Sequence, residues 1–384
     1  MNDKISVLKN AARIYRVLSK ASCNFRPGFF VANKAFFLKS VKNYLSGKRN
    51  IIKGPRSMGI GVCNDCNIKC LYCFEHSPLR IEHGKEAGHI YFTAKMKEEA
   101  YRRLVDELSD LGNTVIRFVG RGESFMHPGF LDMCAYAIKK GQICDITTNG
   151  SLINKEQAKA IVDLGIRKLD ISIGAGFAQT YQKITCADNG IFEGILDIIR
   201  IITEYRKSKN TNNPYILITN VLCSMNYTEI FEMLKKGAAA GVDAVGFHKM
   251  YFCKKRKPLI ENLIINENQK EELISRLFEG IIFSKKNNLQ TNIPFLISLL
   301  KREGNLKTMD YKRMSYKMKN GGMVLADGAV YAWEYPQALG NINEESFRKI
   351  WYSTRYRQIR EQADNICSEN KLFPCATFCR VCDQ

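Results

Sequence analysis

The sequence contains no run of eighteen apolar residues, which is about the shortest length that a membrane-spanning helix needs. The first twenty residues are basic and lack an apolar core followed by a small-residue cleavage site, so they do not match a secretory signal. Acidic residues are few, 38 against 58 Lys and Arg, which gives a net charge of +20. The hydrophobic content of 45% is typical of a globular protein, and we expect a cytoplasmic one.

The excess of positive charge is concentrated at the N-terminus. Residues 1–56 contain thirteen Lys or Arg and one acidic residue, Asp3. Such a basic segment is typical of proteins that contact nucleic acid, a membrane surface or an anionic substrate. Apolar residues at helical spacing predict a helix here that either lies on a membrane surface or packs against the main domain: Val31, Ala35, Leu38, Val41 and Leu45. No strand pattern is present, which argues against a winged-helix module for peptide recognition.

Strand and helix patterns alternate from Met58 onward. Apolar strands are predicted at about 58–63, 114–119, 143–148, 168–173, 215–222 and 242–248, with amphipathic helices between them. This alternation predicts parallel strands joined by right-handed crossovers, and therefore a partial (β/α)6 barrel whose chemistry lies at the C-terminal ends of the strands. We expect four parts: a basic helical extension over 1–56, the barrel over 57–250, a helical connecting region over 251–320 and a small cysteine-containing module over 321–384.

The chain has fourteen cysteines, and seven of them fall in two tight groups. Disulfides do not persist in a reducing compartment, so this clustering indicates metal or redox chemistry. Cys66, Cys70 and Cys73 form a Cys-x-x-x-Cys-x-x-Cys loop directly after the first strand. Three thiolates in so short a loop are able to wrap one corner of an iron-sulfur cube. The alternatives are buried structural thiols, or a zinc site that takes Cys63 as its fourth ligand.

The spacing of this loop resembles that of the radical SAM enzymes. The resemblance implies a 4Fe-4S cluster on Cys66, Cys70 and Cys73, with S-adenosylmethionine on the iron that lacks a protein ligand and Cys63 as a bystander. It also implies cleavage of S-adenosylmethionine to a 5'-deoxyadenosyl radical, with an electron from an external donor of the flavodoxin or ferredoxin type. The backbone of Tyr72 would contact the adenine.

The second strand ends in a turn that resembles the family's Gly-Gly-Glu motif, with an arginine inserted between the glycines. Its residues are Gly120, Arg121, Gly122 and Glu123, and the resemblance implies that Glu123 binds the methionyl amine. In the resembling enzymes the turn that contains Thr148 and Asn149 lies beside the cofactor, and Ser172 lies near the ribose.

Two positions depart from the family pattern at the fourth strand and after it. Gly174 stands where the family often has an acidic residue, and Thr185 stands where an arginine is common in the segment that begins at Tyr181. Lys183 is a candidate to replace the missing charge.

The C-terminal part begins with a predicted hairpin that has Asp327-Gly328 at its turn. Four cysteines follow within sixteen residues: Cys367, Cys375, Cys379 and Cys382. This order resembles the SPASM or twitch extension of radical SAM enzymes and implies one auxiliary iron-sulfur cluster, although four thiolates also suit zinc.

The resemblance implies an enzyme that abstracts hydrogen from an unactivated carbon, with an auxiliary cluster that allows net oxidation or rearrangement. The first candidate substrate is a small polar, sugar-like or lipid-linked molecule, because no peptide-binding module is visible and the N-terminus is basic. A ribosomal peptide is second and RNA is third, since no recognisable RNA module accompanies the basic residues. A non-catalytic iron-sulfur or zinc scaffold is the alternative outside enzyme function.

Overall fold

The structure is a computed structural model that describes residues 54–80, 93–112, 114–250, 254–301, 315–333, 335 and 337–368. The chain from Gly54 onward forms one compact unit. The basic extension predicted over 1–56, with its helix and its membrane contact, lies outside the described residues up to Lys53. Within the described residues, no helix is long and apolar enough to cross a membrane.

The core of this unit is a single ten-stranded sheet in the order β10-β9-β8-β1-β2-β3-β4-β5-β6-β7. Strands β1 to β6 are parallel to their neighbours and confirm the six strands predicted for the barrel. The strands are β1 (Ser57–Ile60), β2 (Val115–Phe118), β3 (Ile143–Thr148), β4 (Lys168–Ser172), β5 (Tyr215–Leu222), β6 (Ala244–Lys249), β7 (Gln290–Thr291), β8 (Gly321–Val324), β9 (Ala329–Tyr331) and β10 (Gly340–Asn341).

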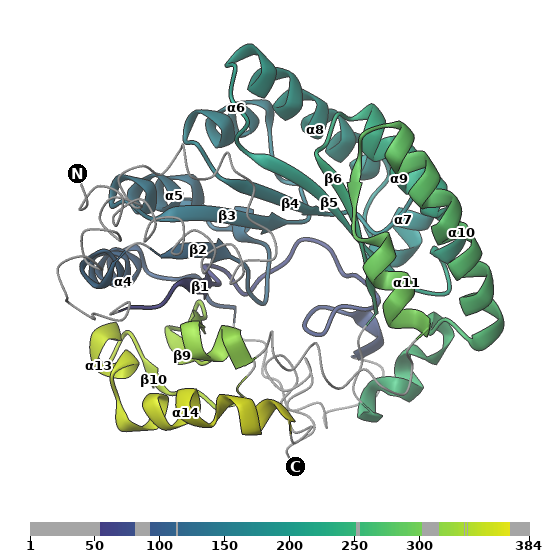
Figure 1. Ribbon diagram of the computed structural model, residues 1–384. Coiled ribbons are helices and arrows are strands. Elements are labelled where there is room, and N and C mark those ends of the chain that lie inside the picture. The colour runs from purple at the N-terminus through teal and green to yellow at the C-terminus, as the bar shows by residue number, and fades with distance from the viewer. Residues whose placement is uncertain are drawn as a thin grey trace, which may run out of the picture. The chain divides into compact units, whose positions relative to one another are not determined.

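The long helices lie along one side of this curved sheet (Figure 1). They are α4 (Glu98–Leu111), α5 (Phe130–Lys139), α6 (Lys155–Asp163), α7 (Ala178–Thr185), α8 (Ile191–Ser208), α9 (Ile230–Ala239), α10 (Glu267–Lys286) and α11 (Ile293–Lys301). Short 3-10 helices are η1 (Pro78–Arg80), η2 (Ser124–Met126), η3 (Tyr227–Glu229) and η4 (Lys254–Leu263). Helices α6 and α10 each begin with a capping box, Asn154 with Gln157 and Asn266 with Gln269, which satisfies backbone N–H groups that a helix start leaves unpaired.

Burial alternates along the strands because successive side chains point to opposite faces of a sheet. In β5 every second residue is buried, beginning with Ile216 and Ile218. This face packs on the helices: a Cβ at Gly237 of α9 would lie 2.3 Å from Val245 and 3.8 Å from Ile218. Residues on the other face are more polar and more exposed, and they include Arg117, Thr147 and His248. The helices therefore cover the apolar face and leave a polar face inside the curve.

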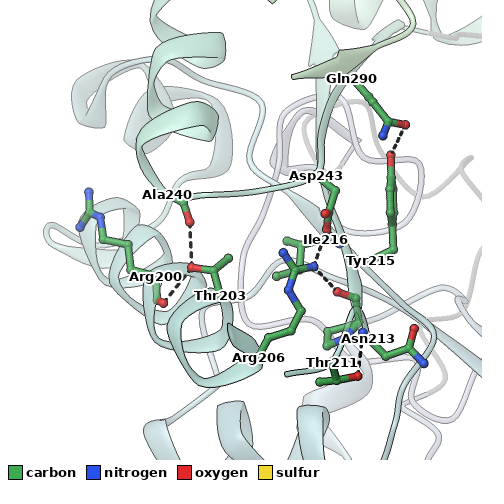
Figure 2. Close-up of polar contacts among 11 residues, drawn as sticks. Arg200, Thr203, Arg206, Thr211, Asn213, Tyr215, Ile216, Ala240, Asp243 and Gln290 are labelled. Atoms are coloured by element: carbon green, nitrogen blue, oxygen red, sulfur yellow. Dashed lines mark hydrogen bonds and ion pairs between the residues drawn. The ribbon is translucent and has the colours of Figure 1, made fainter. Parts of the chain in front are cut away.

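A buried ion pair closes the N-terminal end of β5 and β6. Arg206 of α8 is only 8% exposed, and it donates to the Pro214 carbonyl over 2.7 Å and pairs with Asp243. The carboxylate of Asp243 also accepts the backbone N–H of Ile216 over 2.7 Å (Figure 2). These contacts lie at the end of the barrel opposite the cysteine loop, so their role is to hold the fold together.

The C-terminal hairpin forms part of the barrel sheet. Strand β8 pairs parallel with β1, with Ser57 opposite Gly321, and β9 and β10 continue the sheet antiparallel beyond it. The hairpin and its Asp327-Gly328 turn were predicted, whereas its pairing with β1 was not. Helices α13 (Phe347–Trp351) and α14 (Thr354–Ser368) follow beside it (Figure 1).

Candidate functional site

The cysteine loop leaves β1 at its C-terminal end and is fixed against the end of α7. The backbone N–H of Lys69 donates to the Thr185 carbonyl over 2.9 Å, and the N–H of Leu71 donates to the Ile184 carbonyl over 2.8 Å. Within the loop, the N–H of Cys73 donates to the Cys70 carbonyl over 2.9 Å. The backbone of this loop is therefore held by the fold itself.

Two of the three thiol sulfurs accept hydrogen bonds. The sulfur of Cys73 accepts the backbone N–H groups of Glu75 and His76 over 3.4 and 3.3 Å. The sulfur of Cys66 accepts the side-chain amide of Asn149 over 3.8 Å. Because a neutral thiol is a weak acceptor, N–H groups directed at sulfur favour a thiolate or metal-bound sulfur at these positions.

Burial raises the pKa of the Cys66 thiol to about 11, and the nearby Glu123 and Cys73 act in the same direction. The pKa of Cys70 is raised well above its usual value, first by burial and then by the charges of Cys73 and Cys66. Without a metal, Cys66 and Cys70 therefore favour the protonated thiol, and a bound cation is what would favour their thiolate forms.

The glycines of the β2 turn allow two backbones to approach each other closely. A Cβ at Gly120 would lie 2.6 Å from the Cα of Gly61, and a Cβ at Gly122 would lie 2.1 Å from the Asp65 carbonyl oxygen. The backbone N–H of Glu123 donates to this same carbonyl over 2.7 Å. The two motif loops therefore touch, and glycine is required at residue 122 because no side chain fits there.

Glu123 is 4% exposed and accepts hydrogen bonds from three donors. Oε1 accepts the backbone N–H of Phe125 over 3.1 Å and the hydroxyl of Thr148 over 2.8 Å, and Oε2 accepts the backbone N–H of Asn149 over 2.7 Å. Burial raises the pKa of Glu123 and the three donors lower it, with a net increase. A carboxylate offers about four acceptor positions, so one remains for a ligand such as the amine that the resemblance implies.

Thr148 and Asn149 follow β3 and connect Glu123 with the cysteine loop. The side-chain amide of Asn149 donates to the Asn67 side chain over 3.0 Å, in addition to its contact with Cys66. Its Oδ1 accepts the backbone N–H of Ser151 over 2.9 Å. The structure therefore brings together Cys66, Glu123, Thr148 and Asn149.

Arg121 lies between the two glycines and faces the residues after Cys73. Its Nε is 3.6 Å from Oε1 of Glu75, and its carbonyl oxygen is 3.0 Å from Nε2 of His76. Neither Glu75 nor His76 was predicted as a site residue. No local motif marks them, since their importance comes from a contact with a residue 45 or more positions away.

At the end of β4 the departure at Gly174 has a steric explanation. Gly174 has φ of 72°, a left-handed conformation that favours glycine, and a Cβ there would lie 2.8 Å from the hydroxyl of Tyr72. The Tyr72 side chain therefore occupies the space that a larger residue would need. Ser172 is half-buried in β4, two residues before this contact.

Three polar residues that the sequence did not reveal as site residues hold the loop after β4. Asn220 accepts the backbone N–H of Gly174 over 3.1 Å, and Asn226 donates to the Gly174 carbonyl over 2.7 Å. Glu229 accepts the backbone N–H of Gly176 over 2.8 Å. Asn220 lies on the face of β5 that carries the buried Ile216, Ile218 and Leu222, and it is fully buried itself.

After the β4 loop, α7 carries the segment that begins at Tyr181. Tyr181 is 1% exposed and its hydroxyl has no hydrogen-bond partner among the described residues. The Thr185 hydroxyl donates to the Tyr181 carbonyl over 2.7 Å. Thr185 therefore hydrogen-bonds within the last turn of α7 and does not supply the charge of an arginine. Lys183 is exposed, and the structure gives it no contact with the site.

The cysteine loop supplies the three thiols that a 4Fe-4S cube with one open iron needs, and the N–H groups directed at the sulfurs of Cys66 and Cys73 suit metal-bound sulfur. Among the residues that the structure describes, no group of three or more His, Cys, Asp or Glu side chains is arranged to hold a single metal ion. Cys63 is 1% exposed with its sulfur directed at the Asp65 carbonyl, which fits the role of a bystander.

The second group of cysteines begins near the end of α14. Cys367 lies in the last turn of α14, and its side chain and the residues from 369 onward lie outside the described part of the chain. The auxiliary site on Cys367, Cys375, Cys379 and Cys382 therefore stays a prediction.

Family models match two parts of the chain. Residues 60–225 match the radical SAM superfamily, and residues 317–383 match SPASM, an iron-sulfur cluster-binding domain. The first match contains the cysteine loop, the β2 turn and the loop after β4, and the second contains the hairpin and the last four cysteines.

Curated relatives and solved structures agree with this assignment. The chain is 25% identical to the Fe-coproporphyrin III synthase of Methanosarcina barkeri over 74% of this chain and 71% of that protein. It is 23% identical to the tungsten-containing aldehyde ferredoxin oxidoreductase cofactor-modifying protein of Pyrococcus furiosus, over 84% and 86%. The structure of Streptococcus suis SuiB bound to S-adenosylmethionine has a TM-score of 0.58 at 15% identity, and the match covers 92% of this chain and 79% of SuiB.

These findings, with the cysteine loop at the end of β1, establish the class of the protein. The two domains imply a 4Fe-4S cluster with S-adenosylmethionine and auxiliary iron-sulfur binding. The chain belongs to the radical SAM superfamily and carries a C-terminal SPASM iron-sulfur domain.

Proposed function

We propose that this radical SAM enzyme uses Cys66, Cys70 and Cys73 to hold its cluster and abstracts hydrogen from a small polar or anionic molecule. When bound, the cluster supplies one electron to S-adenosylmethionine and so generates the 5'-deoxyadenosyl radical. The observation that carries the assignment is the convergence of the cysteine loop, Glu123 and Asn149 at the C-terminal ends of β1 to β3. The auxiliary site on Cys367, Cys375, Cys379 and Cys382 would accept an electron in a net oxidation.

In this proposal Glu123 binds the amine of S-adenosylmethionine, as the free acceptor position of its carboxylate allows. Thr148 and the backbone of Asn149 keep the carboxylate in place, and Asn149 also joins it to Cys66. Ser172 is the last residue of β4, and the hydroxyl of Tyr72 from the cysteine loop lies next to Gly174 just beyond it. A site held this rigidly orients the cofactor and reduces the conformational freedom that must be lost on binding.

The face of the sheet that the helices leave uncovered supports a polar substrate. Arg117, Thr147 and His248 are exposed on this face, and Lys168 and Asp170 pair on it over 2.9 Å. Cationic and hydroxyl groups of this kind suit carboxylate, phosphate or hydroxyl groups of a small molecule. The names of curated relatives, Fe-coproporphyrin III synthase and AdoMet-dependent heme synthase, also refer to small molecules.

A peptide is the second candidate substrate. One of the solved structures with a similar fold is Streptococcus suis SuiB bound to its precursor peptide SuiA, with a TM-score of 0.57 at 15% identity. This likeness concerns the fold, so the small molecule stays the first choice. An electron donor of the flavodoxin or ferredoxin type completes the proposed set of partners.

The direct test is release of 5'-deoxyadenosine after anaerobic reconstitution with iron and sulfide and reduction with dithionite. Cys70→Ala should abolish release, because one iron loses its protein ligand. Cys134→Ala is the matched control: it removes a buried thiol of α5, away from the loop, and should keep release close to that of the unmodified protein. Unchanged release by Cys70→Ala would rule out the proposed cluster site.

A further inference from the structure

The inserted arginine of the β2 turn forms a link to the segment that follows Cys73. The Nε of Arg121 lies 3.6 Å from Oε1 of Glu75, and the two side chains are only 14% and 13% exposed. An ion pair so little exposed is weakly screened by solvent. This ion pair joins the β2 turn to the cysteine loop at a second place, apart from the close backbone contacts of Gly120 and Gly122.

A second contact joins the same two segments. Nε2 of His76 lies 3.0 Å from the carbonyl oxygen of Arg121. Because a carbonyl only accepts, Nε2 must carry the proton and donate. Arg121 therefore holds Glu75 through its side chain and His76 through its backbone.

The two residues that Arg121 holds are the two whose backbone N–H groups donate to the sulfur of Cys73. These contacts measure 3.4 Å from Glu75 and 3.3 Å from His76. Arg121 contacts both residues from a different loop, through its side chain at Glu75 and through its carbonyl at His76. Movement of Arg121 would thus move the two N–H groups relative to the sulfur.

We propose that Arg121 is a positioning residue that keeps the Glu75 and His76 N–H groups on the Cys73 sulfur and thereby raises the reduction potential of the cluster. The inference rests on the proposed function, because it requires the cluster to be bound through Cys73. Hydrogen bonds to cluster sulfur stabilise the additional negative charge of the reduced state, and the potential of an iron-sulfur cluster rises accordingly.

The charge of Arg121 offers a competing explanation, since a nearby cation also favours the reduced state. The pair Arg121→Met and Glu75→Gln separates the two. Arg121→Met lowers the potential in both explanations. In the double variant the net charge of the pair is unchanged at zero, so a pure charge effect restores the original potential, whereas loss of the link keeps it low.

The experiment is a redox titration of the reconstituted full-length proteins followed by electron paramagnetic resonance. The signal that changes on addition of S-adenosylmethionine identifies the cluster of the Cys66 loop. We expect Arg121→Met and the double variant both to reduce the equilibrium constant for reduction about tenfold, which is ~59 mV for one electron. A double variant that titrates like the unmodified protein would overturn the proposal.

A measurement without the cluster makes the test independent of loading. Hydrogen exchange of the apoprotein, followed by mass spectrometry of a peptide over residues 74–77, reports the N–H groups of Glu75 and His76. Arg121→Met removes the side-chain contact with Glu75, so it should increase exchange of the Glu75 N–H severalfold and leave α8 and β5 unchanged. Unchanged exchange would contradict the link even if a variant fails to bind iron. If the unmodified protein itself binds no cluster, the proposed function fails while the exchange result still decides the link.

Discussion

The backbone N–H of Asn149 donates to the carboxylate of Glu123 over 2.7 Å and joins the loops after β2 and β3. The side chain of the same asparagine reaches the sulfur of Cys66 in the loop after β1. The loops after β1, β2 and β3 are thus joined through the side chains of Glu123 and Asn149. These groups are therefore held in a small space.

Glu123→Gln should weaken both the fold and the binding of S-adenosylmethionine. The amide has one oxygen, so its NH2 group would face an N–H or hydroxyl donor among Phe125, Thr148 and Asn149. A buried donor left without an acceptor costs about 1–3 kcal/mol. We expect a lower urea midpoint of unfolding and weaker S-adenosylmethionine binding by calorimetry. Binding equal to that of the unmodified protein would exclude a contact between Glu123 and the methionyl amine.

Gly122→Ala should release the cysteine loop from the β2 turn. The new Cβ would lie 2.1 Å from the Asp65 carbonyl oxygen, so the loop backbone must move. We expect the iron and sulfide content after reconstitution to fall strongly while the far-ultraviolet circular dichroism stays unchanged. Gly129→Ala is the control, because its Cβ would meet only His127 at 3.6 Å, an ordinary contact. Equal cluster content in both variants would contradict this account of Gly122.

Alkylation of Cys66 in the apoprotein should be slow and strongly dependent on pH. Its pKa of about 11 lies two units above the usual 9.0, so at pH 8 the thiolate is about 100-fold scarcer than in an ordinary cysteine. The thiolate is the form that reacts, and its population rises about tenfold per pH unit until the pKa is reached. Iodoacetamide labelling from pH 8 to 10, followed by mass spectrometry, measures this. A rate that levels off near pH 9 would show that burial does not raise the pKa as stated.

Asp243→Asn should destabilise the fold without changing the site. Arg206 is buried and would lose its partner charge, and removal of one partner of a buried pair costs about 3 kcal/mol. Urea unfolding should show this loss, and 5'-deoxyadenosine release per folded protein should stay the same. Asp163→Asn, which removes the exposed partner of Lys209, is the control and should change stability little. Similar losses in both variants would contradict the role assigned to burial.

The sequence allowed the barrel strands and the cysteine loop to be predicted because their signals are local. An apolar run predicts β5 over 215–222, and three cysteines in eight residues define the loop. The pairing of β1 with β8 joins Ser57 to Gly321, and no local pattern reveals a contact across so many residues. The C-terminal module was predicted over residues 321–384, but the pairing of its hairpin with the barrel sheet was not.

The same limit applies within the site. Gly174 was recognised as a departure from the family, but its reason is the hydroxyl of Tyr72, a residue about one hundred positions earlier. Arg121 was recognised as an insertion, whereas its contacts with Glu75 and His76 appear only when the two loops are brought together. Candidate site residues that lie in a spaced motif can be proposed from the sequence, whereas contacts between distant loops cannot.

The central claim is that one iron of the cluster on Cys66, Cys70 and Cys73 has no protein ligand and binds S-adenosylmethionine. Mössbauer spectroscopy of protein reconstituted with 57Fe tests it most directly. Replacing Cys375, Cys379 and Cys382 by Ala removes the predicted auxiliary site from the spectrum. We expect a 4Fe-4S cluster in which addition of S-adenosylmethionine changes the parameters of one iron and leaves three unchanged. A spectrum that S-adenosylmethionine does not alter, or a mononuclear thiolate site, would contradict the account.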